Sequence, residues 1–204
     1  MKAQTRRVLL SGLGGLLVFG LCSLLVLGPT WAQGAGSSIG GPFSLTSGNQ
    51  RVVSDEDFRG KWLLVYFGYT HCPNVCPTTL LDLAQTLQEL GPLAAHVQPI
   101  FITIDPERDT PEVVHEYLEA FDPRIIGLTG TPAEIATVAK EYRVYYKKEA
   151  ASADGLDYLM EHSAFVYVMG PTGAYVTLLS PRQGQSPELM ASRLRELITR
   201  AAQR

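Results

Sequence analysis

Two cysteines, Cys72 and Cys76, lie close together in residues 68–77, whose sequence is GYTHCPNVCP. A proline follows each cysteine and disfavours helical backbone at the residue before it, so we expect the next helix to begin at or after Pro77. Both sulfurs would then lie at a helix N-terminus, where unpaired amides and the helix dipole favour the thiolate. The thiolate is the form that attacks disulfides and binds soft metal ions. The segment is therefore predicted to carry sulfur chemistry.

The spacing of the two cysteines leaves two chemistries open. Three residues separate them, one more than in common disulfide oxidoreductases, which gives the sulfurs more freedom to spread around a metal. Thiol–disulfide exchange needs only the pair, whereas two thiolates leave a soft metal ion under-coordinated, so metal binding requires a third ligand. A plain structural disulfide is disfavoured, because prolines and a helix start surround both residues.

The four histidines are the candidates for that third ligand. His71 adjoins the first cysteine, and we expect it to serve packing or electrostatics within the loop. His96 falls in a predicted turn and His115 near the outer face of a predicted helix, where solvated side chains are expected. His162 differs, because it comes just before a buried apolar run at residues 165–169.

The elements that must position these side chains alternate between strand and helix. Periodicity and turn signals predict a hairpin from residues 43–46 and 51–53, a buried strand over 62–67, a helix over 77–90, a strand over 97–104, helices over 110–121 and 131–142, a second hairpin from 165–169 and 175–179, and a helix over 187–201. This order predicts an α/β fold built as a three-layer sandwich. It is also compatible with a thioredoxin-like topology that opens with a β-hairpin.

A long apolar stretch precedes all of these elements. Residues 8–28 carry no charge and, as a helix, are long enough to cross a hydrocarbon core about 30 Å thick. They are predicted to form one transmembrane helix. The basic residues in the tail at residues 1–7 would stay in the cytoplasm, which places everything after the span on the other side of the membrane.

The segment after the predicted span is rich in small residues. Residues 29–40 are expected to form a flexible linker, and residues 41–204 the folded domain. A cleaved signal peptide is the alternative to a retained anchor, since Thr30-Trp31-Ala32 resembles a cleavage site and Arg6-Arg7 could belong to a twin-arginine signal. Cys22 lies within the apolar stretch and is interpreted as a membrane-buried thiol rather than a lipidation site.

Composition excludes several classes of protein. Hydrophobic residues make up 46% of the chain and charged residues 18%, which fits neither a disordered chain nor a multispan membrane protein. Residues 40–204 hold 14 of the 17 basic residues and all 20 acidic ones. We therefore expect no nucleic-acid partner.

Five segments, in order along the chain, resemble the Sco/SenC family of copper-binding proteins. They are Tyr66–Leu80 (YFGYTHCPNVCPTTL), Ile104–Thr110 (IDPERDT), Leu128–Thr131 (LTGT), Tyr142–Tyr146 (YRVYY) and Glu161–Ser163 (EHS). The resemblance implies a thioredoxin-like fold and a tether of one N-terminal helix. It also implies help in loading the dinuclear copper A centre of cytochrome c oxidase.

The resemblance implies a site and partners as well. By motif position the family's copper ligands correspond to Cys72, Cys76 and His162, which would hold one Cu(I) or Cu(II) ion per domain. The expected partners are the copper A subunit of the oxidase, a copper donor protein and the membrane. The chain would then be a metallochaperone rather than an enzyme, single-pass in the cell inner membrane, with its C-terminal domain on the periplasmic side.

An oxidoreductase is the competing hypothesis. Cys72 and Cys76 would then be a redox-active pair that reduces the cysteines of the oxidase copper site, or a redox sensor. Thioredoxin-like oxidoreductases generally place a cis-proline opposite the cysteine loop, yet no proline occurs between Pro132 and Pro171, which disfavours this hypothesis. A zinc enzyme with an open coordination position is a weaker third possibility, since no general base is identifiable near these motifs.

Two further segments receive structural interpretations. Asp105–Asp109 is predicted to form an Asp-Pro turn with an Arg–carboxylate cluster that leads to a helix cap. The tyrosines at positions 142, 145 and 146 are expected to pack rather than to recognise a partner.

Overall fold

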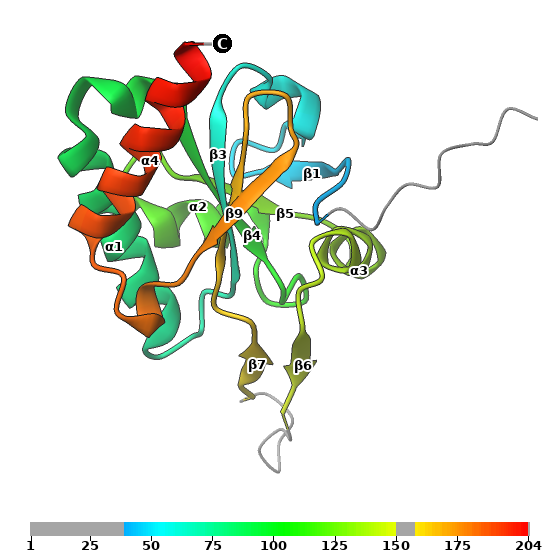
Figure 1. The fold of residues 1–204 in the computed structure, drawn as a ribbon. Helices are drawn as coiled ribbons and strands as arrows, with labels where there is room; N and C mark the ends of the chain where they lie inside the picture. Colours follow the sequence, from blue (N-terminus) through cyan, green and yellow to red (C-terminus); the bar gives the residue numbers. More distant parts are fainter. Residues whose placement is uncertain (1–38, 150–157, 204) are drawn as a thin grey trace, which may run out of the picture. The chain divides into compact units, whose positions relative to one another are not determined.

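The computed structural model describes residues 39–149 and 158–203. Within them, the main sheet has seven strands in the order β2-β1-β5-β4-β3-β8-β9 (Figure 1). The strands are β1 (Ser44–Ser47), β2 (Val52–Ser54), β3 (Trp62–Gly68), β4 (Val97–Thr103), β5 (Ile126–Thr129), β8 (Val166–Met169) and β9 (Tyr175–Leu179). β3, β4 and β5 run parallel, and the two hairpins add antiparallel strands at both edges. The predicted hairpin at the start of the domain is confirmed.

The helices begin at the capping signals that the sequence carries. They are α1 (Val75–Leu90), α2 (Pro111–Glu119), α3 (Pro132–Glu141) and α4 (Pro187–Ala202). The last three begin with proline, which costs nothing there because the first amides of a helix have no intrahelical acceptor. At α3, Thr131 Oγ1 accepts from the Glu134 amide at 3.3 Å, and the Glu134 carboxylate accepts from the Thr131 amide at 2.7 Å. This is the predicted capping box.

Helices cover both faces of the main sheet. α1, α2 and α4 lie on one face and α3 on the other (Figure 1). The crossovers β3-α1-β4 and β4-α2-β5 step in the same direction, so the right-handed rule places α1 and α2 on the same face. Two neighbouring residues of β3 pack on opposite layers. Tyr66 packs on Phe101, which packs on Tyr117 of α2. Phe67 packs on Tyr142, just after α3. The three-layer α/β architecture is therefore as predicted.

Strand β3 occupies the interior of the sheet, between β4 and β8. Every residue from Trp62 to Gly68 is buried, which explains the continuous apolar run. The cysteine segment begins where this strand ends. Its backbone is therefore attached to a strand that is buried along its whole length.

A second, two-stranded sheet stands apart from the main one. It pairs β6 (Tyr146–Lys148) with β7 (Met160–His162), and Tyr146 lies opposite His162. The sequence analysis missed both strands and also β5. β6 and β7 are too short for alternation to show, and β5 contains Gly127, where a Cβ atom would collide with Val114 and Leu118 of α2. A glycine thus marks close packing here, although glycine weakens a strand signal.

Two of the predictions fall outside the described part of the chain. The predicted transmembrane helix at residues 8–28 and nearly all of the predicted linker precede residue 39. Among residues 39–149 and 158–203, no helix combines the length and apolarity that crossing a membrane requires.

Candidate metal centre

The cysteine segment folds into the first turn of α1. The helix begins at Val75, with Asn74 as its N-cap, so the expectation of a start at or after Pro77 is wrong by two residues. Proline is tolerated within the first turn, because the amide it lacks would have no intrahelical partner there. Cys76 is therefore the second residue of the helix. Its amide donates to Sγ of Cys72 at 3.4 Å, so a helix-terminal N–H points at the first sulfur.

The structure brings all three predicted site residues together. One donor atom each from Cys72, Cys76 and His162 lie within 4.8 Å of one another, and Nε2 of His162 is 3.5 Å from Sγ of Cys76. The two sulfurs are free thiols. Cys76 is fully buried, Cys72 is 9% exposed and His162 is half-buried, so the cluster lies just below the surface. Three convergent donors near the surface are the arrangement that a metal-binding site requires.

The orientation of His162 leaves one ring nitrogen directed at the sulfurs. Its Nδ1 lies 3.0 Å from the carbonyl oxygen of Ser163, which can only accept, so Nδ1 carries the proton. Nε2 then presents a lone pair toward Cys76. The ring meets Tyr66 and Tyr69 edge-on at centroid distances of 6.4 and 5.9 Å. Backbone and aromatic contacts thus fix both the tautomer and the tilt of the imidazole.

The two cysteines differ in their proton affinity. The hydrogen bond from the Cys76 side chain, above all, holds the pKa of Cys72 well below its ordinary value, and the Cys76 and Asn74 amides act in the same direction. The same bond to Cys72, together with burial, raises the pKa of Cys76. Cys72 is therefore the more acidic sulfur of the reduced pair and Cys76 the less acidic one.

The space around Cys76 depends on a glycine at the end of β3. A Cβ atom at Gly68 would lie 2.8 Å from Sγ of Cys76, 2.8 Å from Cε2 of Phe101 and 3.2 Å from Cε1 of Tyr66. Real Cβ atoms do not approach so closely, so only glycine leaves the sulfur in its place.

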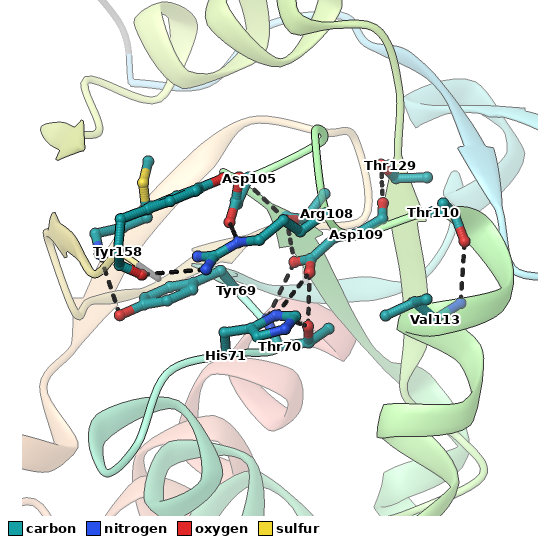
Figure 2. Close-up of polar contacts among 12 residues, drawn as sticks. Tyr69, Thr70, His71, Asp105, Arg108, Asp109, Thr110, Val113, Thr129 and Tyr158 are labelled. Atoms are coloured by element: carbon teal, nitrogen blue, oxygen red, sulfur yellow. Dashed lines mark hydrogen bonds and ion pairs between the residues drawn. The ribbon is translucent and has the colours of Figure 1, made fainter. Parts of the chain in front are cut away.

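The loop that carries the cysteines is anchored by a buried carboxylate. Asp109 accepts from the Thr70 amide at 3.0 Å and from Thr70 Oγ1 at 2.6 Å (Figure 2). It also accepts from Thr103 Oγ1 at 2.5 Å. Thr129 of β5 donates to the Asp109 carbonyl at 2.8 Å. Burial raises the pKa of Asp109 above its ordinary range. This residue therefore links the cysteine loop to the ends of β4 and β5.

The Asp105–Asp109 segment forms the predicted turn. Arg108 Nε donates to Asp105 Oδ2 at 2.6 Å, and Thr110 Oγ1 accepts from the Val113 amide at 3.3 Å to cap α2 (Figure 2). The Arg–carboxylate cluster and the helix cap are confirmed.

The remaining histidines lie outside the cluster. His71 is about half-exposed, with Nδ1 3.0 Å from Thr70 Oγ1 and 3.9 Å from the Asp109 carboxylate. His96 is exposed at the end of a short 3₁₀ turn, and His115 is exposed beside Glu119 at 3.6 Å. These positions agree with the roles expected from the sequence.

Sequence reasoning missed Tyr69 as part of the site. The residue is 2% exposed, its ring contacts His162, and its hydroxyl accepts from the Met160 amide at 3.2 Å. A second tyrosine that packs at the cluster is Tyr66 of β3. Both lie in the aromatic run just before the cysteines, but nothing in that run indicates a contact with a histidine so far along the chain.

Comparison with known proteins adds the family. A family model described as SCO1/SenC matches residues 32–199. The chain belongs to the SCO1/SenC family. A family relative, "Protein SCO1 homolog 1, mitochondrial" of Arabidopsis thaliana, is 45% identical over 141 residues, which make up 69% of this chain and 42% of that protein. "Protein SCO1 homolog, mitochondrial" of Homo sapiens is 40% identical over 161 residues, or 77% and 53% of the two chains. This chain spans about half the length of these two relatives.

Solved SCO1/SenC structures share the fold of the domain. The structure of Bradyrhizobium japonicum ScoI with copper bound has a TM-score of 0.72 at 46% identity and covers 78% of this chain and 99% of that chain. Yeast Sco1 with copper bound has a TM-score of 0.73 at 37% identity and covers 79% and 89%. The mixed α/β fold around a central sheet therefore matches the thioredoxin-like Sco structures, as the sequence predicted.

Proposed function

We propose that this chain is a membrane-tethered copper chaperone that binds one Cu(I) or Cu(II) ion through Cys72, Cys76 and His162. The convergence of the three donor atoms within 4.8 Å carries the proposal. Membership of the SCO1/SenC family and the copper-bound Bradyrhizobium and yeast structures support it.

The donor set fits copper as a cargo ion. Cu(I) prefers soft thiolates and accepts low coordination, whereas Cu(II) gains from an imidazole. Two cysteines and one histidine can therefore hold either oxidation state with little rearrangement. The lowered pKa of Cys72 favours its thiolate, whereas Cys76, whose pKa is raised, must lose its proton when the ion binds. The half-buried position leaves the imidazole side open for stepwise ligand exchange with a partner.

The proposed destination is the dinuclear copper A centre of cytochrome c oxidase, with a copper donor protein upstream. This follows the role that the family resemblance implies. The apolar stretch at residues 8–28 would tether the domain to the cell inner membrane on its periplasmic side. The chain would act by binding and transferring the ion rather than as an enzyme.

A copper titration of the full-length reduced chain tests the proposal. Under anaerobic conditions with a competing Cu(I) chelator, the wild-type chain should bind one ion tightly, and Cys76→Ser should lose that site. Loading with Cu(II) should depend on His162. Failure of the folded, reduced chain to retain either ion would reject the chaperone function.

The asymmetry of the cysteine pair favours a second candidate function. A low-pKa, partly accessible Cys72 beside a buried, protonated Cys76 resembles the pair of an attacking and a resolving thiol in thiol–disulfide exchange. Attack by Cys72 on a substrate disulfide would form a mixed disulfide and release one substrate thiolate. Cys76, on losing its proton, would then release the second and leave a Cys72–Cys76 disulfide. This activity needs no His162, so turnover of a disulfide substrate by metal-free His162→Ala distinguishes the two functions.

A further inference from the structure

The strand that carries His162 lacks support from the main sheet. Among residues 39–149 and 158–203, β7 pairs only with β6, and this two-stranded sheet makes no ladder with the seven-stranded one. An isolated strand pair is marginally stable in water. Side-chain contacts must therefore hold His162 beside the cysteines.

One set of contacts begins at the turn after β4. Arg108 Nη1 donates to the carbonyl oxygen of Tyr158 at 3.1 Å, and the guanidinium carbon lies 3.5 Å from the centroid of the Tyr158 ring. The Tyr158 hydroxyl donates to Asp105 Oδ1 at 2.6 Å, and Asp105 Oδ2 accepts from Arg108 Nε at 2.6 Å. Figure 2 shows these three side chains as a closed ring of contacts. We call this set the Arg108 clamp.

The clamp is shielded from water. Asp105 is 3% exposed and Tyr158 6%, and 16% of the Arg108 side chain is exposed. Burial, followed by the hydrogen bond to Asp105, raises the pKa of Tyr158, so its hydroxyl stays a donor. Lys148 of β6 also places Nζ 3.7 Å from the centroid of the same ring. The Tyr158 side chain therefore contacts both the turn after β4 and Lys148 of β6.

The clamp acts on the strand only a few residues before the imidazole. Tyr158 lies two residues before Met160, the first residue of β7, whose amide donates to the hydroxyl of Tyr69 in the cysteine loop at 3.2 Å. The Tyr69 ring in turn contacts His162. β7 is thus fixed at Tyr158 by the clamp and at Met160 by the cysteine loop itself.

We propose that Arg108 is a positioning residue that, with Asp105 and Tyr158, holds His162 against the two cysteines and so sets how strongly the site favours Cu(II). This inference rests on the proposed copper-binding function. Two thiolates satisfy Cu(I), whereas Cu(II) gains from the imidazole. Loosening β7 therefore weakens Cu(II) binding far more than Cu(I) binding.

Two variants of the full-length chain test the clamp. Arg108→Met replaces the aliphatic part of the side chain but removes its charge and hydrogen bonds. Tyr158→Phe keeps the ring but removes the bond to Asp105. Arg124→Met is the matched control. Arg124 pairs with Asp122 at 2.7 Å in the turn before β5, and among the described contacts this Arg–carboxylate pair has none with β6 or β7. Loss of the clamp should lower Cu(II) affinity by about ten-fold or more and Cu(I) affinity by less than about three-fold, as for other partners that orient metal ligands.

A second readout needs no metal. Amide hydrogen exchange at Met160 and His162 should be faster in the metal-free Arg108→Met chain, while exchange in α4 stays at the wild-type rate. A wild-type ratio of Cu(II) to Cu(I) affinity, or wild-type exchange in β7, in folded Arg108→Met would overturn the inference. If Arg108→Met does not fold, Tyr158→Phe decides by the same two measurements. Failure of the wild-type chain to bind copper would reject the proposed function instead, and the exchange experiment would still test the clamp.

Discussion

Nε2 of His162 lies 3.5 Å from Sγ of Cys76, although 86 residues separate the two along the chain. The thiol comes from the first turn of α1, on the main sheet, and the imidazole from the separate two-stranded sheet. The site is therefore formed by two structural units that meet at the end of β3. The two thiols and the imidazole can therefore be perturbed independently.

Removing the imidazole should separate the two oxidation states of copper. In His162→Ala we expect one Cu(I) ion still to bind through the two sulfurs, while Cu(II) affinity falls by about 10- to 100-fold, because Cu(II) loses its nitrogen donor. Competition titrations measure both affinities, and electron paramagnetic resonance reports nitrogen coordination of Cu(II). His115→Ala, on the exposed face of α2, is the control. Unchanged Cu(II) binding in His162→Ala would exclude the residue as a ligand.

The stability of the reduced, metal-free chain should depend on pH through Cys72. The pKa of Cys72 in the folded chain lies below its ordinary value of 9.0, so between the two values the unfolded chain binds more protons than the folded one. The free energy of unfolding should therefore rise with pH over this window and fall as the chain is acidified. Cys76 has the opposite shift, so its contribution is present below its ordinary pKa and is lost at higher pH.

Chemical denaturation at a series of pH values measures this dependence. Between about pH 5 and about pH 8, the slope of stability against pH should be smaller in Cys72→Ser than in wild type, since the serine does not titrate there. Equal slopes for the two chains would show that Cys72 is not an anionic thiolate in the folded state.

Adding a methyl group at the end of β3 should displace the buried sulfur. In Gly68→Ala the new Cβ would lie 2.8 Å from Sγ of Cys76 and from Phe101, so the chain should be destabilised by about 1–3 kcal/mol, as in other overpacked cores. Copper affinity should fall as well. Gly170→Ala is the control, because its nearest neighbour atom, Cγ2 of Val176, is 3.4 Å away. Thermal unfolding and Cu(I) competition measure the two effects. Equal stability and equal Cu(I) affinity in the two variants would contradict this account of Gly68.

Replacing the buried carboxylate behind the cysteine loop should loosen that loop. In Asp109→Ala the Thr70 amide and the hydroxyls of Thr70 and Thr103 lose their shared acceptor, and each unsatisfied buried group costs about 1–3 kcal/mol. Alkylation of Cys72 should also become faster, because the loop opens more often. Denaturant titration and the rate of reaction with iodoacetamide measure the two effects. Wild-type values for both would show that Asp109 does not anchor the loop.

The sequence predicted those parts of the fold whose signal is local. The apolar run of β3 and the Thr-Pro starts of α2 and α3 each reflect constraints within a few neighbouring residues, and the structure has them where expected. The start of α1 at Val75 was missed because Pro77 was expected to stand at the first helical position. The whole first turn tolerates proline, since its amides have no intrahelical acceptor.

The site was harder to predict because its ligand candidates come from distant segments. The two cysteines were recognisable from their spacing and neighbours, but the prediction of His162 as the third ligand depended mainly on the family resemblance. The contacts that orient it, from Tyr69, Arg108 and Tyr158, join three separate stretches of chain and leave no periodic signal. Their assignment required the structure, and the role of the three donors as copper ligands stays a prediction.

The point at which the chain enters the domain has a consequence for docking. Gly40 lies against Met169, which pairs with Leu63 near the start of β3, whereas the cysteine segment follows Gly68 at the end of that strand. Leu63 and Gly68 are five residues apart along β3, which corresponds to roughly 17 Å. Whatever precedes residue 39 is therefore joined to the domain well away from the sulfurs and the imidazole. A partner that binds at the cluster therefore contacts the end of β3 opposite to the point of attachment.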